Sequence, residues 1–364
     1  MNTTRKVSKM QAYNGMPWTP NPVCDNPFFL LALVCMTQTK HWTQTTITRV
    51  VVAAAGVAAL GWLLKGIDPQ RLVQAFEAVP LWVWPVSVVG MVVSHLLRGG
   101  RMRAEWRERL DMGWLTAWAL VVRHSAWVVL APMRGGEGVY LWALHRQGDI
   151  PLRDAGMSLL KLRLQDMAVL GVMAVLALTP ASWPVRVLAA LVALSAAMWV
   201  LPMAWRAIVA RARAQIQTQG LVPSKPMPAA TWESWFYALS NWVVKLAAIA
   251  LPLWALAGSR VADGAVAGLD AAWRGALGGE LAAAMPFQPP AGLGPYEAGV
   301  WAGVRSAADL PLAEVAAAAL TVHLLMLLVT VASATLARLM GWSARSYRKP
   351  SPPAANDPYW DSAP

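Results

Sequence analysis

Residues 132–140 read PMRGGEGVY and residues 290–300 read PAGLGPYEAGV, and both stretches interrupt long apolar segments. Each stretch combines helix-breaking proline and glycine with one glutamate, Glu137 or Glu297. In lipid, such residues are tolerated only where they are buried in protein or line a polar cavity. Broken segments that recur in the two halves of a chain are also typical of a transporter's binding site. The two stretches therefore predict a functional site inside a membrane protein.

The composition of the 364-residue chain is that of a protein that lies mostly in lipid. Hydrophobic residues make up 57% of the chain and charged residues 14%, with a mean hydropathy of +0.43, whereas soluble domains have about 25% charged residues. The formal charge of +12 gathers in short loops beside apolar runs, and no nucleic-acid-binding module is recognisable. Cys24 and Cys35 are too few for a metal cage or a disulfide framework. We expect no nucleic-acid partner and no cofactor.

Long apolar windows predict about six spanning helices in an all-α, polytopic membrane protein. They lie at 48–64, 80–98, 161–179, 185–204, 235–257 and 312–338. The expected membrane domain covers 46–340, between a polar N-terminal extension at 1–45 and a disordered tail at 341–364. The extension leaves two alternatives open: a signal-peptide core at 28–36, or a chain whose translation begins at Met36.

Basic residues predict which side of the membrane each loop faces. Three basic clusters, at 98–109, 206–225 and 338–349, should face the cytoplasm by the positive-inside rule, with Arg98 and Arg101 as loop residues of the first. The first broken stretch then enters from the cytoplasmic side and returns to it, and the second does the same from the outside. We expect two opposed re-entrant helical hairpins in a bacterial inner-membrane protein with both termini in the cytoplasm.

Several charged side chains lie at membrane depth, where each costs about 2.5 to 3.5 kcal/mol and needs a partner or water. Arg163 and Asp166 are three residues apart on one helical face, so they can pair or share a polar cavity. Lys161 is expected to snorkel to the cytoplasmic interface. Lys245 is too deep in its span for that and is assigned a functional role, and Glu280 is the cavity candidate of the second hairpin.

The hairpin tips predict an anion site. Half-helices that begin after Gly136 and after Pro295 direct free N–H groups and a positive dipole end toward the midplane. An alternative is that Glu137 and Glu297 only cap their own helices, and His323 is expected to be a hydrogen-bonded packing residue. The candidate substrate-binding residues are Arg123, Arg134, Gly136, Glu137, Arg163, Asp166, Lys245, Glu280, Gly292, Gly294 and Glu297.

These residues resemble a known family, the transmembrane region of lysylphosphatidylglycerol synthase, also described as flippase-like integral membrane proteins. The family pattern runs Leu-Pro-Gly-Arg-Ala-Gly-Glu with an Arg three residues on, then Glu-Arg-x-x-Asp, and late in the chain Pro-Gly-Gly-x-Gly followed by Glu. Similar elements stand here at 131–137, at 162–166 and at 289–297, and Arg98 matches an upstream Arg. The sequence departs from the pattern at Tyr140, where the family has Arg, and at Leu162, where it has Glu.

The resemblance covers about residues 46–340 and implies lipid translocation without the soluble aminoacyl-transferase domain that two-domain members carry. We expect a flippase that moves an anionic phospholipid or a polyprenyl-phosphate-type lipid between leaflets. The departures at Tyr140 and Leu162 leave two alternatives open: a change in which headgroup is accepted, or a divergent member of the family with weakened function. An alternative is a non-transporting accessory subunit that partners a glycosyltransferase or another lipid-modifying enzyme, or forms a homo-oligomer. An enzyme is not expected, because metal-ligand spacings, nucleophile motifs and phosphate loops are not recognisable.

Overall fold

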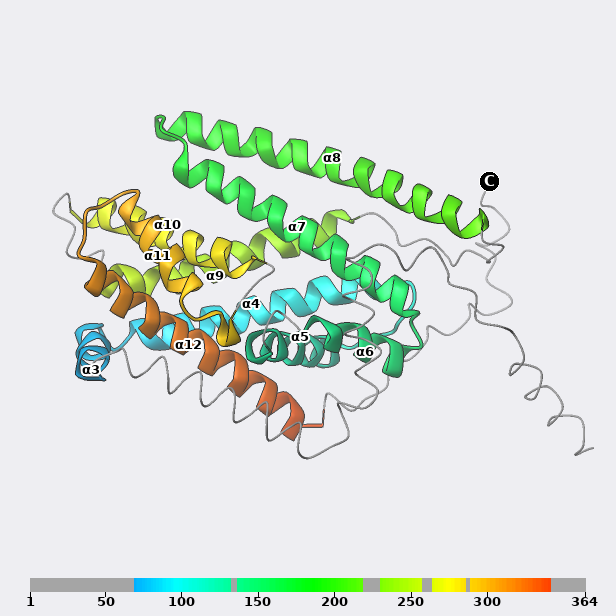
Figure 1. Ribbon diagram of the computed structural model, residues 1–364, viewed down its shortest axis with the longest axis horizontal. Helices are drawn as coiled ribbons and strands as arrows, with labels where there is room; N and C mark the ends of the chain where they lie inside the picture. Colours follow the sequence, from blue (N-terminus) through cyan, green and yellow to red (C-terminus); the bar gives the residue numbers. More distant parts are fainter. Residues whose placement is uncertain (1–68, 132–135, 219–229, 257–263, 286–288, 342–364) are drawn as a thin grey trace, which may run out of the picture. The chain divides into compact units, whose positions relative to one another are not determined.

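The computed structural model describes residues 69–131, 136–218, 230–256, 264–285 and 289–341, and its regular elements there are all helices (Figure 1). All of them belong to one unit of the chain, Ala54–Pro364. Within the described ranges they are α3 (Pro69–Ala78), α4 (Val83–Trp106), α5 (Trp114–Leu130), α6 (Glu137–Gly148), α7 (Leu152–Leu178), α8 (Trp183–Thr218), α9 (Trp232–Leu256), α10 (Ala265–Ala283), the 3-10 turn η4 (Pro290–Gly292), α11 (Pro295–Arg305) and α12 (Leu312–Leu339).

The all-α membrane fold predicted from the sequence is confirmed. Five of the six predicted spans coincide with α4, α7, α8, α9 and α12, whereas 48–64 lies outside the described residues, as do the extension and nearly all of the tail. Four helices are long and apolar enough to cross a membrane, namely α4, α8 over Trp183–Arg211, α9 and α12. Helix α7 is not among them, because Lys161, Arg163 and Asp166 interrupt its apolar sequence. Helix α3 was not predicted.

Both broken stretches separate pairs of helices, as predicted. Helix α6 begins at Glu137, directly after Gly136. Helix α11 begins at Pro295, which suits the first helical position because its fixed φ is helical and it has no N–H to leave unpaired. The chain therefore forms two helical hairpins, α5 with α6 and α10 with α11. Their entry from opposite sides of the membrane stays a prediction.

Helix α4 is longer than the sequence predicted. The predicted span ends at 98 and a basic loop follows, but the helix continues to Trp106. Arg98 and Arg101 consequently lie within the helix, and Arg101 is buried. Their interpretation as loop residues was wrong, because α4 continues past both of them and each guanidinium group donates a hydrogen bond to a side chain on a neighbouring helix.

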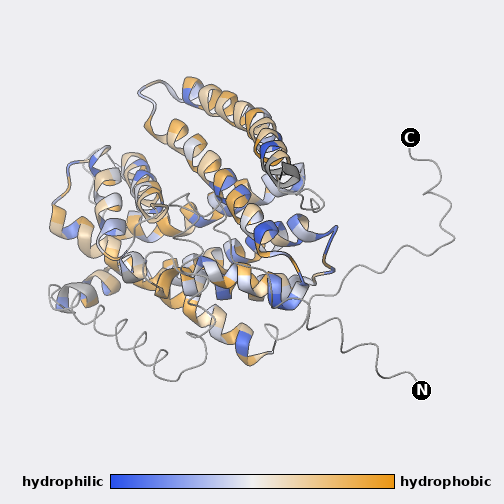
Figure 2. Cartoon of the chain, turned by 45° about the vertical axis from the view of Figure 1, so that its right-hand side comes forward, coloured by the Kyte–Doolittle hydropathy of each residue, from blue (hydrophilic) through white to orange (hydrophobic). Residues whose placement is uncertain are grey.

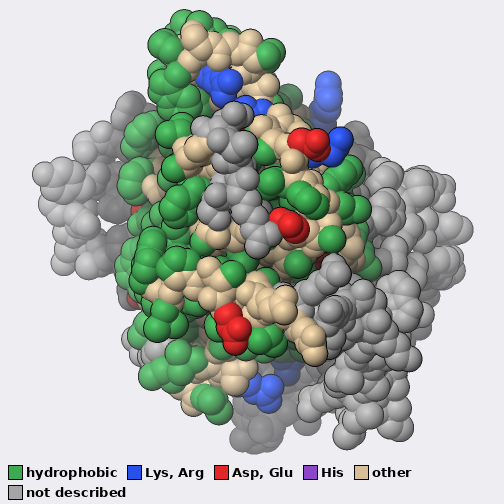
Figure 3. Space-filling model, turned by 90° about the vertical axis from the view of Figure 1, so that its left-hand side faces the viewer, with side chains coloured by type: hydrophobic (Ala, Val, Ile, Leu, Met, Phe, Trp, Pro, Cys, Tyr) green, Lys and Arg blue, Asp and Glu red, His purple; other side chains and the backbone are tan. Residues whose placement is uncertain are grey.

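Apolar side chains fill the core between the helices and also cover the outer faces of the helices. One buried cluster contains side chains of α4, α7, α9, α10, α11 and α12. Helix α8 packs along α7 and exposes large apolar side chains such as Leu188, Val192 and Trp199. Hydrophobic residues predominate along most helices (Figure 2), and hydrophobic side chains form continuous areas on the face drawn in Figure 3. An apolar surface of this kind suits contact with lipid.

The contacts between helices follow a twofold pattern. If α4, α5, α6 and α7 are matched in order with α9, α10, α11 and α12, most contacts between the helices of one half have a counterpart in the other. Helix α4 packs against its counterpart α9, and α5 packs on α12 as α7 packs on α10. Each half thus contains a long helix, a broken hairpin and a second long helix. This order is the internal repeat that the two broken stretches indicated.

Candidate functional site

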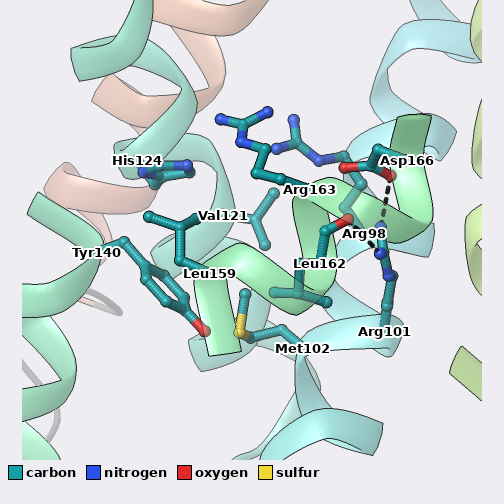
Figure 4. A pocket seen from close by; sticks show the side chains of 10 residues that line it. All are labelled: Arg98, Arg101, Met102, Val121, His124, Tyr140, Leu159, Leu162, Arg163 and Asp166. Carbon is teal, nitrogen blue, oxygen red and sulfur yellow. Dashed lines mark hydrogen bonds and ion pairs between the residues drawn. The ribbon is translucent and has the colours of Figure 1, made fainter. Parts of the chain in front are cut away.

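A small polar cavity lies between α4, α5, α6 and α7 (Figure 4). Its volume is about 40 Å³, and one water molecule needs about 10–15 Å³ by this measure, so a few waters fit. Three arginines face a single aspartate, which gives the lining an excess of positive charge. The residues that line the cavity are Arg98, Arg101, Met102, Val121, His124, Tyr140, Leu159, Leu162, Arg163 and Asp166.

Arg101 is held firmly by α7. Its Nη1 donates to Asp166 Oδ1 at 2.6 Å, and its Nε and Nη2 donate to Gln165 Oε1 at 3.1 and 2.7 Å. Nη2 also donates to the backbone carbonyl of Leu162 at 2.8 Å. Asp166 accepts a further hydrogen bond from Trp242 Nε1 on α9 at 3.0 Å. Arg101 is therefore engaged by protein groups and serves chiefly to orient Asp166.

Arg163 and Asp166 share the cavity, which is one of the two arrangements that their spacing allowed. Instead of pairing with each other, they contact different helices. Arg163 Nη2 donates to Glu137 Oε1 at 3.0 Å, and both side chains are about one-third exposed. The Glu137–Arg163 pair joins the start of α6 to α7, so the first broken stretch is held directly at the cavity.

Arg98 is the cavity arginine whose charge is least compensated. Its Nη1 donates to the hydroxyl of Ser125 on α5 at 2.9 Å. Among the described residues, no carboxylate forms an ion pair with it, in contrast to Arg101 and Arg163. Arg98 was not among the candidate site residues predicted from the sequence, because its position in a basic cluster assigned it to a loop. The spacing of Arg98, Arg101 and Glu105, which are three and four residues apart, was the available signal that the helix continues.

Tyr140 is fixed by a buried hydrogen-bond chain at one side of the cavity. Trp106 Nε1 donates to the Tyr140 hydroxyl at 3.0 Å, and that hydroxyl lies 3.0 Å from Ser158 Oγ. Ser158 donates to Glu105 Oε1 at 2.7 Å, and Lys161 Nζ lies 2.8 Å from Glu105 Oε2. The expectation that Lys161 snorkels to the interface was wrong, because its side chain is only 3% exposed and is paired inside the protein.

Lys245 and Glu280 form an ion pair between α9 and α10, with Nζ 2.6 Å from Oε2. Neither residue lines the cavity. Trp242 connects them to it, since its ring lies 5.1 Å from Lys245 Nζ while its N–H contacts Asp166. In the part of the chain that the structure describes, no group of His, Cys, Asp and Glu side chains could hold a metal ion.

Glu297 both caps α11 and contacts α12. Its Oε2 accepts a hydrogen bond from the Gly294 N–H at 2.6 Å, so Glu297 caps its own helix, although capping is not its only contact. Gly294 has a φ of 94°, which a residue with a side chain rarely adopts. Glu297 Oε1 lies 2.7 Å from His323 Nδ1, so His323 is the hydrogen-bonded packing residue that we expected. The carboxylate of Glu297 itself occupies the start of α11, where we expected an incoming anion.

The other candidate residues are placed as follows. Arg134 lies outside the described residues. Arg123 is half-buried in α5 and is not among the residues that line the cavity. Gly136 is buried against the backbone of Trp127 and Val128, where a side chain would not fit. Gly292 has a φ of 69° in the turn before α11, and that turn contacts α5.

The Glu137–Arg163 and Glu297–His323 pairs occupy corresponding places in the two halves. In each, a glutamate near the start of the short helix after the break pairs with a basic side chain on the next long helix. The separation along the chain is 26 residues in both cases. The short sequence similarity of the two stretches did not by itself establish this correspondence. The correspondence of the two pairs agrees with the symmetric contacts between the helices.

Long apolar helices around a buried arginine cavity define the chain as an integral membrane protein of helical-bundle type. The chain belongs to the family described as the lysylphosphatidylglycerol synthase TM region, whose model matches residues 46–334. The family resemblance found in the sequence motifs is thus confirmed. Among curated proteins, none matches the chain.

Proposed function

We propose that this protein moves an anionic lipid, either a phospholipid or a polyprenyl-phosphate-type lipid, between the two leaflets of a bacterial inner membrane. The observation that carries the proposal is the arginine-lined cavity inside the bundle. Charged groups at membrane depth are costly and are typical of substrate pathways. A lipid with an anionic headgroup could neutralise the excess positive charge of such a cavity without leaving the membrane.

The ion pairs around the cavity indicate where a phosphate would bind. Asp166 compensates Arg101, and Glu137 compensates Arg163. Among the described residues, Arg98 forms no ion pair and donates its side-chain hydrogen bond to the neutral hydroxyl of Ser125, so it is the arginine best placed to accept a new anionic partner. Guanidinium groups bind phosphate with two parallel hydrogen bonds, which supports a role for Arg98 in headgroup recognition.

The size of the cavity restricts the part of the lipid that enters. At about 40 Å³ it holds a few waters and no acyl chain. In our proposal the headgroup enters after the bundle loosens, while the lipid chains stay in the bilayer. The Glu137–Arg163 and Glu297–His323 pairs hold the short hairpin helices on the long helices, so they would open and close access. Arg123, Arg134 and Gly136 stay proposed contributors to the same anion site.

The proposal is tested with purified protein in phosphatidylcholine vesicles that contain fluorescent phosphatidylglycerol. Flipping is followed as loss of fluorescence when a reductant quenches the outer leaflet. We expect the wild type to accelerate flipping over protein-free vesicles, and Arg98→Gln to lower the rate at least about tenfold, as expected for loss of a hydrogen bond to a charged group. Arg305→Gln is the matched control, because Arg305 is an exposed arginine paired with Asp309 on the surface.

Two outcomes would contradict the proposal. In one, the wild type does not accelerate flipping, which would favour the accessory-subunit alternative and call for crosslinking to find a partner. In the other, Arg98→Gln flips the probe as fast as Arg305→Gln, which would separate transport from the arginine cavity.

A further inference from the structure

The Lys245–Glu280 pair contains a buried oxygen whose hydrogen-bonding capacity is not used. Glu280 is 3% exposed, and its Oε2 lies 2.6 Å from Lys245 Nζ. Its other oxygen, Oε1, is buried and has no hydrogen-bond partner among the described residues. Buried polar atoms without partners are uncommon and costly, so each calls for an explanation. A proton on Oε1 is a simple way to lower the cost of this carboxylate whenever Lys245 is engaged elsewhere.

Lys245 and Glu280 differ in how exposed their side chains are. The Lys245 side chain is 25% exposed, whereas the Glu280 side chain is 4% exposed. An anion can therefore approach the ammonium group from its open side, while the carboxylate stays behind it. Trp242 links Lys245 to Asp166, which lines the arginine cavity. The Lys245 ammonium is thus separated from the cavity wall by a single indole ring.

The charged and titratable groups around Glu280 come from three helices. Lys245 lies on α9, and Arg98 on α4 and Tyr296 on α11 are close enough to interact with Glu280 electrostatically. Helix α7 also packs against α10, and its buried residues in the shared apolar cluster, such as Val169, Leu170 and Met173, have no ionisable group. Two cations therefore stabilise the anionic form of Glu280, and Lys245 is the one in direct contact.

We propose that Glu280 carries a proton together with the lipid, so that transport is a symport of one lipid anion and one proton. This inference rests on the proposed lipid-flipping function. When the lipid phosphate moves from the arginine cavity past Trp242 to Lys245, the Nζ–Oε2 ion pair of Lys245 and Glu280 breaks and an ammonium–phosphate pair forms. Glu280 then binds a proton from water on the side to which the site is open. One negative and one positive charge enter together, so the charge of the site does not change.

The coupling follows from the cost of leaving a buried carboxylate without its cation. Removing one partner of a buried ion pair is strongly unfavourable, and protonation avoids that cost. By linkage, if the lipid anion favours protonation of Glu280, protonation of Glu280 favours binding of the lipid anion to the same extent. For a lipid with one negative charge, a gradient of one pH unit should drive about a tenfold excess of lipid in the leaflet on the alkaline side.

The test uses the wild-type chain in phosphatidylcholine vesicles with fluorescent phosphatidylglycerol, and compares vesicles with and without a gradient of one pH unit. We expect the wild type to reach a leaflet ratio of about ten with the alkaline leaflet enriched, and a ratio near one without the gradient. Glu280→Gln keeps the size of the side chain but removes its proton site, so its ratio should stay near one in both conditions. Asp270→Asn is the control, because Asp270 is a carboxylate on the same helix that pairs with Arg274 at 2.8 Å near the surface.

The outcomes separate this inference from the proposed function. If the wild type flips the probe but the pH gradient does not change the leaflet ratio, the proposal of proton coupling is wrong and the proposal of lipid flipping is retained. The same conclusion holds if Glu280→Gln responds to the gradient as Asp270→Asn does. If the wild type does not flip the probe faster than protein-free vesicles, both proposals fail. The wild-type measurement decides the coupling even if Glu280→Gln does not fold.

Discussion

Arg101 and Asp166 form an ion pair with 2.6 Å between Nη1 and Oδ1, and this pair joins α4 to α7 in the wall of the cavity. Only 6% of the Arg101 side chain and 13% of the Asp166 side chain are exposed. The pair therefore cannot be satisfied by bulk water, and each charge depends on the other. This dependence leads to the first prediction, which concerns the stability of the cavity wall.

Arg101→Met should destabilise the protein by roughly 3–5 kcal/mol, because it removes the cation in direct contact with the buried Asp166 carboxylate. The double variant Arg101→Met with Asp166→Leu should recover most of that loss, since replacing a whole buried pair by apolar side chains is often neutral. Denaturant unfolding of the purified proteins in detergent measures both changes. A single variant as stable as the wild type would contradict the prediction.

The helices α10 and α11 approach so closely at Gly303 that no side chain should be tolerated at this position. A Cβ on this residue of α11 would collide with the backbone carbonyl of Arg274 on α10 and lie 2.9 Å from the Cα of Gly275. Gly303→Ala should therefore cost at least about 1–3 kcal/mol, because the two backbones must move apart.

The matched control is Gly171→Ala, within the long helix α7. Nothing lies within 4 Å of the position that its Cβ would occupy, and Gly171 is exposed. Alanine is the better helix former by about 1 kcal/mol, so this variant should be as stable as the wild type or slightly more stable. Thermal unfolding followed by circular dichroism compares the two. Equal stability of both alanine variants would be inconsistent with the close helix contact.

Much of the architecture could be predicted from the sequence. Apolar windows located the described spans, and the proline and glycine clusters located both breaks. Even the first residues of the short helices, Glu137 and Pro295, follow from local chemistry: a break followed by a residue that suits a helix start. Such features depend on neighbours along the chain, so the sequence contains the information directly.

The partners of the charged residues could not be predicted in the same way. Arg98, Arg101 and Lys161 lie at positions that local rules assign to a basic loop or to the interface. Their true partners, such as Glu105 and Asp166, are on other helices. A buried charge is stabilised by tertiary contacts, which sequence spacing does not reveal. For the same reason, the spacing of Arg163 and Asp166 allowed an ion pair within one helix. In the folded protein, Arg163 instead pairs with Glu137 on α6, and Asp166 pairs with Arg101 on α4.

Tyr140 supports a prediction about the buried network beside the cavity. Its hydroxyl accepts the Trp106 N–H and contacts Ser158. Tyr140→Phe should lower the free energy of unfolding by about 1–3 kcal/mol, because the indole N–H loses its acceptor in a buried place. The control is Tyr237→Phe, since the Tyr237 ring packs on Trp114 and its hydroxyl makes no hydrogen bond to a described residue. A neutral Tyr140→Phe in unfolding experiments would contradict the importance of the network.

The last prediction tests the correspondence between Glu297–His323 and Glu137–Arg163. If the two pairs are equivalent, an arginine at position 323 should pair with Glu297 in the way that Arg163 pairs with Glu137 in the first half. His323→Arg should keep most of the flipping activity in the vesicle assay. His323→Leu should lower it at least about tenfold, since it removes a hydrogen bond to the Glu297 carboxylate. The same comparison in the first half uses Arg163→Lys and Arg163→Leu. A His323→Arg variant as inactive as His323→Leu would show that the halves use their pairs differently, and that position 323 requires the imidazole itself.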